Sequence, residues 1–208
     1  MHSSSKKVFF GNNVFCVNDN VYEPAEDSFL FAENLHVGED DVVVDVGTGC
    51  GILGIIAARK ARRVFAVDVN PYALQCAREN ARLNRVADKM FFVRTDLLKP
   101  IKIGQQFDVM TFNAPYLPLE NEDGSWLGYA WSGGAGGRQV IDRFIREAPE
   151  YLHPNGQILL MQSSLSGIDE TLRSFSQRGL DACVVTSRRL PFFETIVLMR
   201  AVQLKGSK

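Results

Sequence analysis

The sequence predicts a single doubly wound α/β domain, in which a mainly parallel sheet ends in an antiparallel hairpin. Short runs rich in β-branched and aromatic residues alternate with segments of helical period along the chain. Five of these runs are apolar throughout, as strands are when helices cover both faces of a parallel sheet. The last two runs are separated only by a PFF segment, which is too short for a crossover and indicates a hairpin.

The length and the composition of the chain fit one globular domain. Its 208 residues are 46% apolar and 23% charged, which is enough to bury a core without disulfides or metals. We expect one domain over residues 1–208, in which residues 1–20 form a polar N-terminal extension. No segment approaches the roughly 18 apolar residues of a membrane span, and no signal peptide is recognisable, so no membrane partner is expected.

Charge and cysteine content restrict the partners and the compartment further. The formal net charge of −1 does not favour direct contact with nucleic acid, whose phosphates attract basic surfaces. The four cysteines lack the paired spacing of a zinc site or a disulfide framework, and His36 and His153 are isolated from them. We therefore expect reduced thiols, no metal site and a cytoplasmic location.

The expected strands and helices alternate along the chain. Strands are predicted at residues 41–47, 63–69, 90–96, 107–113, 156–164, 182–190 and 194–201. Helices are predicted at about 26–35, 51–60, 71–83, 137–150 and 167–178. A Gly-rich connection from Leu117 to Gly137 is long for a compact domain, and such loops are usually functional. Its aromatic residues either shape a groove for a substrate or pack onto their own domain: Trp126, Tyr129 and Trp131.

A glycine-rich loop, DVGTGCGILG, follows the first buried strand and opens a helix. Glycines there permit a tight turn and bring the backbone amides of the positive helix end against a ligand. Gly49, Gly51 and Gly54 fit the GxGxxG pattern of dinucleotide sites. The alternative is the GxGxG loop of methyltransferases, in which an acidic residue precedes the glycines: Asp45, Gly47, Gly49 and Gly51. The glycines alone leave both cofactors open.

Acidic side chains at the ends of three successive strands favour S-adenosylmethionine. Asp45 would repel a pyrophosphate but suits the ammonium group of a methionine moiety. Asp68 ends the second strand, where a carboxylate binds ribose hydroxyls in both kinds of site. Asp96 ends the third strand, where it would accept the exocyclic amine of adenine, with Val69 and Leu97 on the faces of the ring. One Asp after a strand is usually a helix cap, but capping does not account for three together.

The fourth strand ends in NAPYLP, at the edge of the sheet where open α/β sheets bind ligands. Methyl transfer to a delocalised nitrogen requires that the nitrogen be held in line and that its developing positive charge be stabilised. The Asn113 side-chain oxygen and the Ala114 carbonyl are acceptors for the two N–H groups of a primary amino group. Pro115 stiffens the turn and Tyr116 supplies a ring face. Asn and Pro also favour ordinary turns. The interpretation as a catalytic motif therefore depends on its position directly after the fourth strand.

At these residues the sequence resembles the amino-methyltransferases with an [ND]PP[YF] motif, and among them the HemK-like N5-glutamine methyltransferases of translation release factors. The likeness covers most of the chain and includes YEPAEDSFL (22–30) and WSGGAGGRQVIDRF (131–144), which are similar to the short archaeal and eukaryotic branch. It implies a Rossmann-like seven-stranded class I methyltransferase fold and methylation of the glutamine amide in the GGQ loop of a release factor. Ala114 stands where the family has its first proline, which makes the turn looser.

Sequence and resemblance together define two sets of site residues. The predicted catalytic residues form the motif itself: Asn113, Ala114, Pro115 and Tyr116. The predicted binding residues for S-adenosyl-L-methionine are Pro24, Ser28, Asp45, Gly47, Thr48, Gly49, Gly51, Asp68, Val69, Asp96, Leu97 and Asn113.

The strand at 90–96 lies at the edge of the sheet in this strand order. Its MFFV run presents apolar side chains and unpaired backbone groups, which invite a partner strand. The resemblance implies a small zinc-binding activator protein as that partner. The alternative is that a helix or loop of the chain itself covers the edge.

Three other functions compete with glutamine methylation. The same motif serves the planar amino groups of adenine and guanine in nucleic acid, although the net charge does not indicate a basic groove. A nicotinamide-dependent oxidoreductase would use GCGILG but would assign no role to Asp45, Asp96 or Asn113. A non-catalytic module, conceivable because of Ala114, would bind S-adenosylmethionine and transfer nothing.

Overall fold

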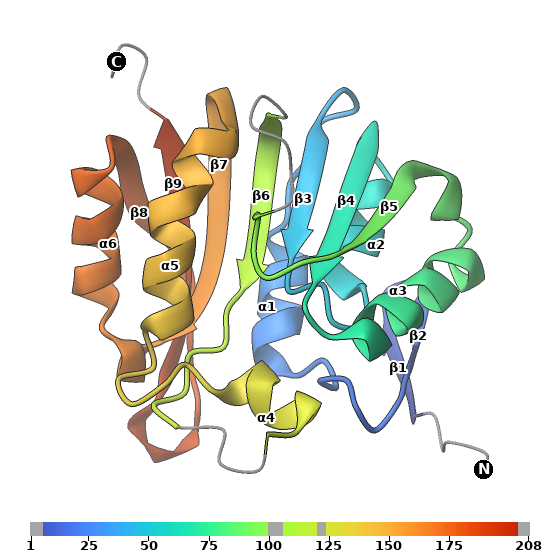
Figure 1. Cartoon of the computed structure of the whole chain (residues 1–208), viewed down its shortest axis with the longest axis horizontal. Helices are drawn as coiled ribbons and strands as arrows, with labels where there is room; N and C mark the ends of the chain where they lie inside the picture. The colour runs from blue at the N-terminus through green and yellow to red at the C-terminus, as the bar shows by residue number, and fades with distance from the viewer. Residues whose placement is uncertain (1–5, 100–105, 120–123, 204–208) are drawn as a thin grey trace.

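A computed structural model of the chain describes residues 6–99, 106–119 and 124–203. A seven-stranded sheet forms its centre, in the order β5-β4-β3-β6-β7-β9-β8, with helices on both faces (Figure 1). The strands are β3 (Val42–Val46), β4 (Arg63–Asp68), β5 (Met90–Arg94), β6 (Phe107–Asn113), β7 (Leu152–Ser163), β8 (Leu180–Arg189) and β9 (Thr195–Gln203). The predicted fold class is therefore confirmed.

Strand directions follow the prediction as well. The five strands from β3 to β7 are parallel, and β9 runs antiparallel to both β7 and β8. β7 begins at Leu152 rather than at residue 156, because Phe107 pairs with Leu152 before the ladder changes register at Val109. All the parallel strands point their carboxyl ends to one edge of the sheet, which places the loops after them together.

Five helices lie close to their predicted ranges, and one was not predicted. The expected helices are α1 (Glu26–Glu33), α2 (Ile52–Ala58), α3 (Pro71–Leu83), α5 (Gln139–Glu147) and α6 (Ile168–Gln177). The additional helix, α4 (Trp126–Trp131), lies inside the Gly-rich connection that was expected to be a loop. Short 3₁₀ turns complete the chain: η1 (Ala87–Lys89), η2 (Ala148–Tyr151), η3 (Ser164–Ser166) and η4 (Pro191–Phe193). In the part of the chain that the structure describes, no helix is long and apolar enough to cross a membrane.

Two apolar cores lie on opposite faces of the sheet. Val43 belongs to the core beneath α1, α2 and α3, and Val44 belongs to the core beneath α5 and α6, because successive residues of a strand point to opposite faces. Both side chains are fully buried. This burial on both faces explains why the parallel strands are apolar throughout, as the sequence indicated.

Residues 6–17, within the predicted N-terminal extension, form regular secondary structure that packs onto the domain. Lys6–Phe10 (β1) and Asn13–Val17 (β2) form an antiparallel hairpin in a sheet of their own, with Gly11 in the left-handed region at the turn. Phe15 and Val17 are buried in the core on the α3 side. The hairpin lies beside α3 (Figure 1).

Two asparagines, Asn80 of α3 and Asn84 directly after its last residue, attach this hairpin to the domain. The Asn80 side chain accepts the Cys16 N–H at 2.8 Å and donates to the Cys16 carbonyl at 3.0 Å. Asn84, one turn later, makes the same pair of bonds with Val14, at 3.1 and 2.8 Å. The two amides therefore take the place of a third strand along the edge of β2. Asn80 also donates to the Cys50 carbonyl, which connects the hairpin to the glycine-rich loop.

Candidate active site

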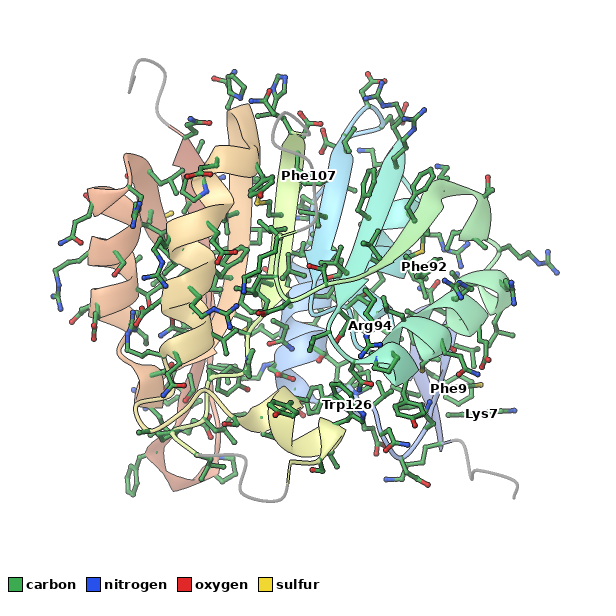
Figure 2. The ribbon with its side chains drawn as sticks, in the orientation of Figure 1. Lys7, Phe9, Phe92, Arg94, Phe107 and Trp126 are labelled. Carbon is green, nitrogen blue, oxygen red and sulfur yellow. The ribbon has the colours of Figure 1, made fainter. Side chains whose placement is uncertain are left out.

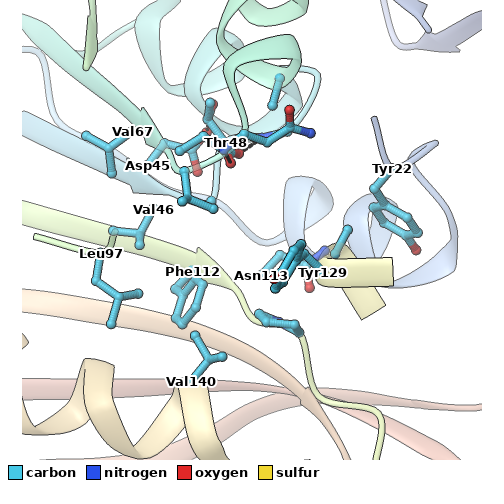
Figure 3. A pocket seen from close by; sticks show the side chains of 18 of the residues that line it. Tyr22, Asp45, Val46, Thr48, Val67, Leu97, Phe112, Asn113, Tyr129 and Val140 are labelled. Carbon is cyan, nitrogen blue, oxygen red and sulfur yellow. Dashed lines mark hydrogen bonds between the residues drawn. The ribbon is translucent and has the colours of Figure 1, made fainter. Parts of the chain in front are cut away.

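A cavity of about 560 Å³ opens at the carboxyl edge of the sheet, where the loops after β3, β4, β5 and β6 meet. That volume is typical of pockets for small molecules. It is lined by most of the predicted binding and catalytic residues: Pro24, Ser28, Asp45, Gly47, Thr48, Gly49, Asp68, Val69, Asp96, Leu97, Asn113 and Pro115. Leu97, Phe112 and Val140 gather at one end of the cavity, and Asn113 and Tyr129 lie at the other (Figure 3).

The glycine-rich loop turns tightly along one wall of this cavity. Gly47 and Gly49 have φ angles of 63° and 56°, in the left-handed region that favours glycine. Gly51, at φ 90°, precedes the first residue of α2 and does not line the cavity. A Cβ there would lie 3.0 Å from the Cβ of Ala77, so this glycine allows α2 and α3 to pack closely. The structure thus places Gly51 in helix packing rather than at the ligand surface.

Asp45 lies behind the glycine loop and is hydrogen-bonded to it. Its Oδ2 accepts hydrogen bonds from the Thr48 hydroxyl at 2.6 Å and the Gly54 N–H at 3.0 Å, and its Oδ1 accepts from the Thr111 hydroxyl at 2.8 Å. The side chain is buried, and burial raises its pKa to about 6 in spite of these bonds. A carboxylate in this position holds the loop in shape and brings negative charge close to the cavity.

Asp68 at the end of β4 is fixed by two backbone amides. Its Oδ2 accepts the Gly49 N–H and its Oδ1 accepts the Asn70 N–H, both at 2.9 Å. Burial raises the pKa of Asp68, while these hydrogen bonds act in the opposite direction. The carboxylate is therefore held in one orientation at the cavity wall, as a residue that binds ribose hydroxyls must be.

Asp96 reaches the cavity, but part of its carboxylate is already engaged. Its Oδ2 accepts hydrogen bonds from Arg143 and from Lys99. Burial acts to raise the pKa of Asp96, but the two cations outweigh it and the pKa is lowered. An adenine amine would therefore have to use Oδ1. Leu97, beside it, adopts a φ of 56°, which is costly for a bulky residue and aims its side chain at the cavity.

Asn113 is the most distinctive residue of the site. Its Nδ2 donates to Asp27 Oδ2 at 3.0 Å and lies 3.3 Å from the Ser28 hydroxyl oxygen. Its Oδ1 is buried and has no hydrogen-bond partner among the residues that the structure describes. An unsatisfied buried acceptor costs about 1–3 kcal/mol, and a catalytic role is one of the explanations for such a group. The Asn113 amide is therefore fixed at its nitrogen and free at its oxygen.

Asp27 organises this end of the site, and the sequence analysis did not single it out. Its carboxylate accepts hydrogen bonds from the Tyr22 hydroxyl at 2.9 Å, the Tyr116 hydroxyl at 3.2 Å and the Ser28 N–H at 2.6 Å. Burial, and then the charge of Asp27, raise the pKa of both phenols, so both stay protonated as donors. The signal was present in YEPAEDSFL, one position before the predicted Ser28.

A second, much smaller pocket meets the cavity at Asn113. It is lined by Tyr22, Asp27, Asn113, Ala114, Tyr116, Leu117, Ala130 and Trp131. Ala114 and Tyr116 lie here rather than in the main cavity. Asn113 thus stands between two spaces, one large enough for a cofactor and a much smaller one whose lining includes the rings of Tyr22, Tyr116 and Trp131.

The alanine of the motif adds a hydrogen bond that a proline there lacks. Ala114 is buried, and its N–H donates to the Met161 carbonyl of β7 at 3.4 Å. This bond continues the pairing of Asn113 with Met161 by one residue. The turn after β6 is therefore held by a hydrogen bond where a proline ring would hold it by its fixed φ.

The connection after the motif folds over the site. Trp126 and Tyr129 of α4 line the cavity, and the Trp131 ring meets the Tyr22 ring edge-on with a centroid distance of 4.9 Å. Gly137 packs so closely that a Cβ there would lie 2.4 Å from the Tyr116 carbonyl oxygen. The aromatic residues of this connection thus contact both the cavity and the rest of the domain.

Comparison with known proteins agrees with this geometry. The family profile described as ribosomal protein L11 methyltransferase (PrmA) matches residues 28–116. A candidate protein N5-glutamine methyltransferase of Methanocaldococcus jannaschii is 40% identical over 181 residues, which cover 86% of this chain and 90% of that protein. Human methyltransferase HEMK2 is 32% identical and shares 81% of this chain and 84% of its own length.

A solved structure extends the comparison to three dimensions. The Mtq2–Trm112 complex of E. cuniculi, described as responsible for methylation of the eRF1 translation termination factor, contains a chain that superposes with a TM-score of 0.70 at 26% identity. The match covers 89% of this chain and 99% of that one. Together with the Asn113 site, these similarities establish that the chain belongs to the HemK-like family of S-adenosylmethionine-dependent protein N5-glutamine methyltransferases.

Proposed function

We propose that this protein methylates the side-chain amide nitrogen of the glutamine in the GGQ motif of a translation release factor. The observation that carries the proposal is the buried Asn113 Oδ1, which has no partner within the described residues and belongs to a residue that lines both pockets. A primary amide offers N–H donors, so a glutamine side chain supplies the partner that this oxygen lacks. The M. jannaschii relative is named as a candidate protein N5-glutamine methyltransferase and the E. cuniculi complex as methylating eRF1, which supports the same acceptor.

The cavity fits S-adenosylmethionine as the methyl donor. Asp68 would bind the ribose, and Val69 and Leu97 would enclose the adenine, with Asp96 at its amine. The glycine loop, with Asp45 behind it, would hold the charged methionine moiety. When bound, this cofactor supplies a methyl group on a positively charged sulfur, which departs as a neutral thioether. The nitrogen that receives the methyl group gives up one proton, which passes to solvent.

The chain's own residues then have two tasks, orientation and charge stabilisation. The Asn113 oxygen and the Ala114 carbonyl accept the amide N–H groups and so direct the nitrogen lone pair towards the cavity. The buried Asp27 carboxylate, bonded to Asn113 and Tyr116, brings negative charge near the nitrogen as it becomes positive. The acceptor side chain would enter through the smaller pocket between Tyr22, Tyr116 and Trp131.

We further propose that β5 binds a small zinc-binding partner protein by strand addition. β5 pairs only with β4 in the described parts of the chain, and its register has no bulge. The opposite edge strand, β8, is interrupted by a register shift after Val184, and such irregularities protect an edge from pairing. The complex of the E. cuniculi relative with Trm112 supports this kind of partner.

Product mapping tests the proposed acceptor. The chain, with and without a Trm112-type partner, is incubated with a release factor and labelled S-adenosylmethionine, and the peptides are sequenced by tandem mass spectrometry. We expect one methyl group on the GGQ glutamine, and none when the acceptor carries Gln→Ala at that position. The proposal would be refuted if the label appeared on a lysine or on added nucleic acid while the GGQ glutamine stayed unmodified both with and without the partner protein.

A further inference from the structure

Exposed apolar side chains occur on the segments that adjoin the NAPY turn, and one of them, Trp131, lines the smaller pocket. Leu119 and Leu165 are each 53% exposed, Trp131 is 40% exposed, and Phe193 is fully exposed. Large apolar side chains are rarely left in solvent as a group unless they meet a partner. We refer to Leu119, Trp131, Leu165 and Phe193 as the apolar rim.

The rim segments are connected to one another and to the NAPY turn. The Leu117 N–H donates to the Trp131 carbonyl, and the Ser132 hydroxyl donates to the Leu119 carbonyl. These bonds hold α4 against the segment that follows the motif.

The other half of the rim is connected in the same way. A Cβ at Gly137 would lie near both the Tyr116 carbonyl oxygen and the Ser166 side chain, so η3, which contains Leu165, is close to the motif. The Thr195 N–H donates to the Ser164 hydroxyl at 3.0 Å, which joins η3 to the β8–β9 turn. The β8–β9 turn and α4 both lie at the carboxyl edge of the sheet (Figure 1).

Phe193 is held in solvent by an unfavourable backbone conformation. Its φ is 65°, in the left-handed region, where a bulky residue is a genuine outlier. The Leu190 N–H donates to the Glu194 carbonyl across this turn at 2.8 Å. Glycine or asparagine would fit the turn with less strain, and the exposed ring stabilises nothing by burial. Strain that the fold does not use is typical of a functional position.

We infer that the apolar rim is the docking surface for the acceptor protein, with Phe193 as its anchor; the inference rests on the proposed function. A glutamine side chain reaches only a few ångströms from its backbone. If it contacts Asn113 through the smaller pocket, the acceptor backbone must lie across the mouth, against the wall that Trp131 forms. The acceptor surface beside the glutamine then meets Leu165 and Phe193. Aromatic side chains that become buried in this way dominate binding energy at interfaces.

The test compares an intact acceptor with a short peptide. Phe193→Asn removes the ring and suits the left-handed backbone, so the variant folds; Leu165→Ala is a second, independent variant. The matched control is Phe9→Asn, because Phe9 is 67% exposed on the β1–β2 hairpin, at the opposite flank from the β8–β9 turn (Figure 2). For each variant we measure three quantities with the Trm112-type partner present. They are the KM for the release factor, the KM for a GGQ peptide and the Kd for S-adenosylmethionine.

We expect Phe193→Asn to raise KM for the intact release factor about tenfold, as truncation of an interface anchor does, and to leave the peptide KM and the cofactor Kd unchanged. Phe9→Asn should change none of the three. An unchanged KM for the intact acceptor overturns the inference, as does an equal rise for peptide and protein. A wild-type dimer that Phe193→Asn dissociates, with KM unchanged, would assign the rim to a second copy of the chain. Absence of glutamine transfer by the wild type refutes the proposed function instead, and the inference with it.

Discussion

At the scale of single residues, the site depends on one amide whose two ends have different tasks. Asn113 is fixed by its nitrogen, which donates to the buried Asp27 carboxylate, and we propose that its oxygen accepts an N–H of the acceptor amide. Enzymes gain much of their rate from orientation of this kind. A misplaced hydrogen-bond acceptor at Asn113 could not direct the lone pair of the substrate nitrogen. Asp27 therefore acts as a positioning residue through Asn113 and Tyr116.

Substitution of Asp27 by Asn tests this role. An amide cannot accept hydrogen bonds at both ends. Its nitrogen would face Asn113 and Tyr116 in place of Oδ2, or Tyr22 and the Ser28 N–H in place of Oδ1, and either arrangement opposes two donors and disturbs this end of the site. We expect kcat to fall about 100-fold, a loss comparable to that of one charge-stabilising group, while Kd for S-adenosylmethionine changes little. Calorimetry and single-turnover assays separate the two quantities. Asp181→Asn, on the exposed face of β8, is the control and should match the wild type. Equal losses in cofactor affinity and in rate for Asp27→Asn would contradict the positioning role of Asp27.

The pH dependence of cofactor binding tests the buried Asp45. Its pKa is raised to about 6, and a bound cation favours its ionised form. Affinity for S-adenosylmethionine should therefore fall as the pH drops through that value, by about tenfold from pH 7.5 to pH 5. Methylthioadenosine, which lacks the charged methionine moiety, is the control and should bind with little pH dependence. Calorimetry at both pH values measures the affinity for each ligand. Equal pH profiles for the two ligands would exclude Asp45 as the titrating group.

At the scale of the elements, the N-terminal hairpin belongs to the site although it lies outside the main sheet. Asn80 joins β2, α3 and the glycine loop through bonds to Cys16 and Cys50. The segment that follows the hairpin supplies Tyr22 and Pro24 to the cavity wall. Folding of the hairpin onto α3 and shaping of the cofactor site are therefore coupled.

Asn80→Ala tests this coupling. It leaves the Cys16 amide and the Cys50 carbonyl without their partners, which should destabilise the fold by about 2–4 kcal/mol and weaken S-adenosylmethionine binding. Gln75→Ala, at an exposed position of the same helix, is the matched control and should be nearly neutral. Denaturant unfolding and calorimetry measure the two effects. The coupling is disproved if Asn80→Ala loses stability but binds the cofactor as tightly as the Gln75 variant.

Sequence patterns predicted the elements whose burial is strong and missed those that depend on distant contacts. The parallel strands are apolar because helices cover both faces, so Val42–Val46 was recognisable without a structure. The hairpin is short and half exposed, and its FFGNNVF signal has little apolar content on its outer face. Asp27 meets Asn113 across 86 positions of the chain, and no local pattern reports such a contact. Gly51 matched its motif, but the motif does not distinguish a ligand contact from close helix packing.

At the scale of the whole molecule, the two edges of the sheet differ. β5 has a regular register and an exposed Phe91, whereas the ladder of β8 is irregular next to Val184. An intact edge with an apolar side chain invites strand addition, and a bulged edge resists it. The cofactor cavity and the rim occupy a third side, the carboxyl edge, so a partner on β5 leaves the mouth of the site open.

Matched substitutions at the two edges test this difference. Phe91 is 45% exposed and Val184 is 46% exposed, so lysine at either position meets a similar degree of solvent. We expect Phe91→Lys to lower affinity for a Trm112-type partner at least about tenfold and Val184→Lys to leave it unchanged, because only β5 forms the interface. Co-purification and calorimetry measure the affinities. The reverse order of effects would assign the partner to β8.

The central claim is that Asn113, although it lines the cofactor cavity, contributes far more to transfer than to cofactor binding, and single-turnover kinetics of Asn113→Ala test it most directly. Cofactor Kd is measured by calorimetry, and methyl transfer to the release factor is then followed at saturating S-adenosylmethionine, beside Asp68→Ala. We predict that Asn113→Ala binds the cofactor within about threefold of the wild type but transfers at least about 1000-fold more slowly, whereas Asp68→Ala loses affinity first. Transfer by Asn113→Ala at nearly the wild-type rate, or an equal loss of binding in both variants, would contradict the claim.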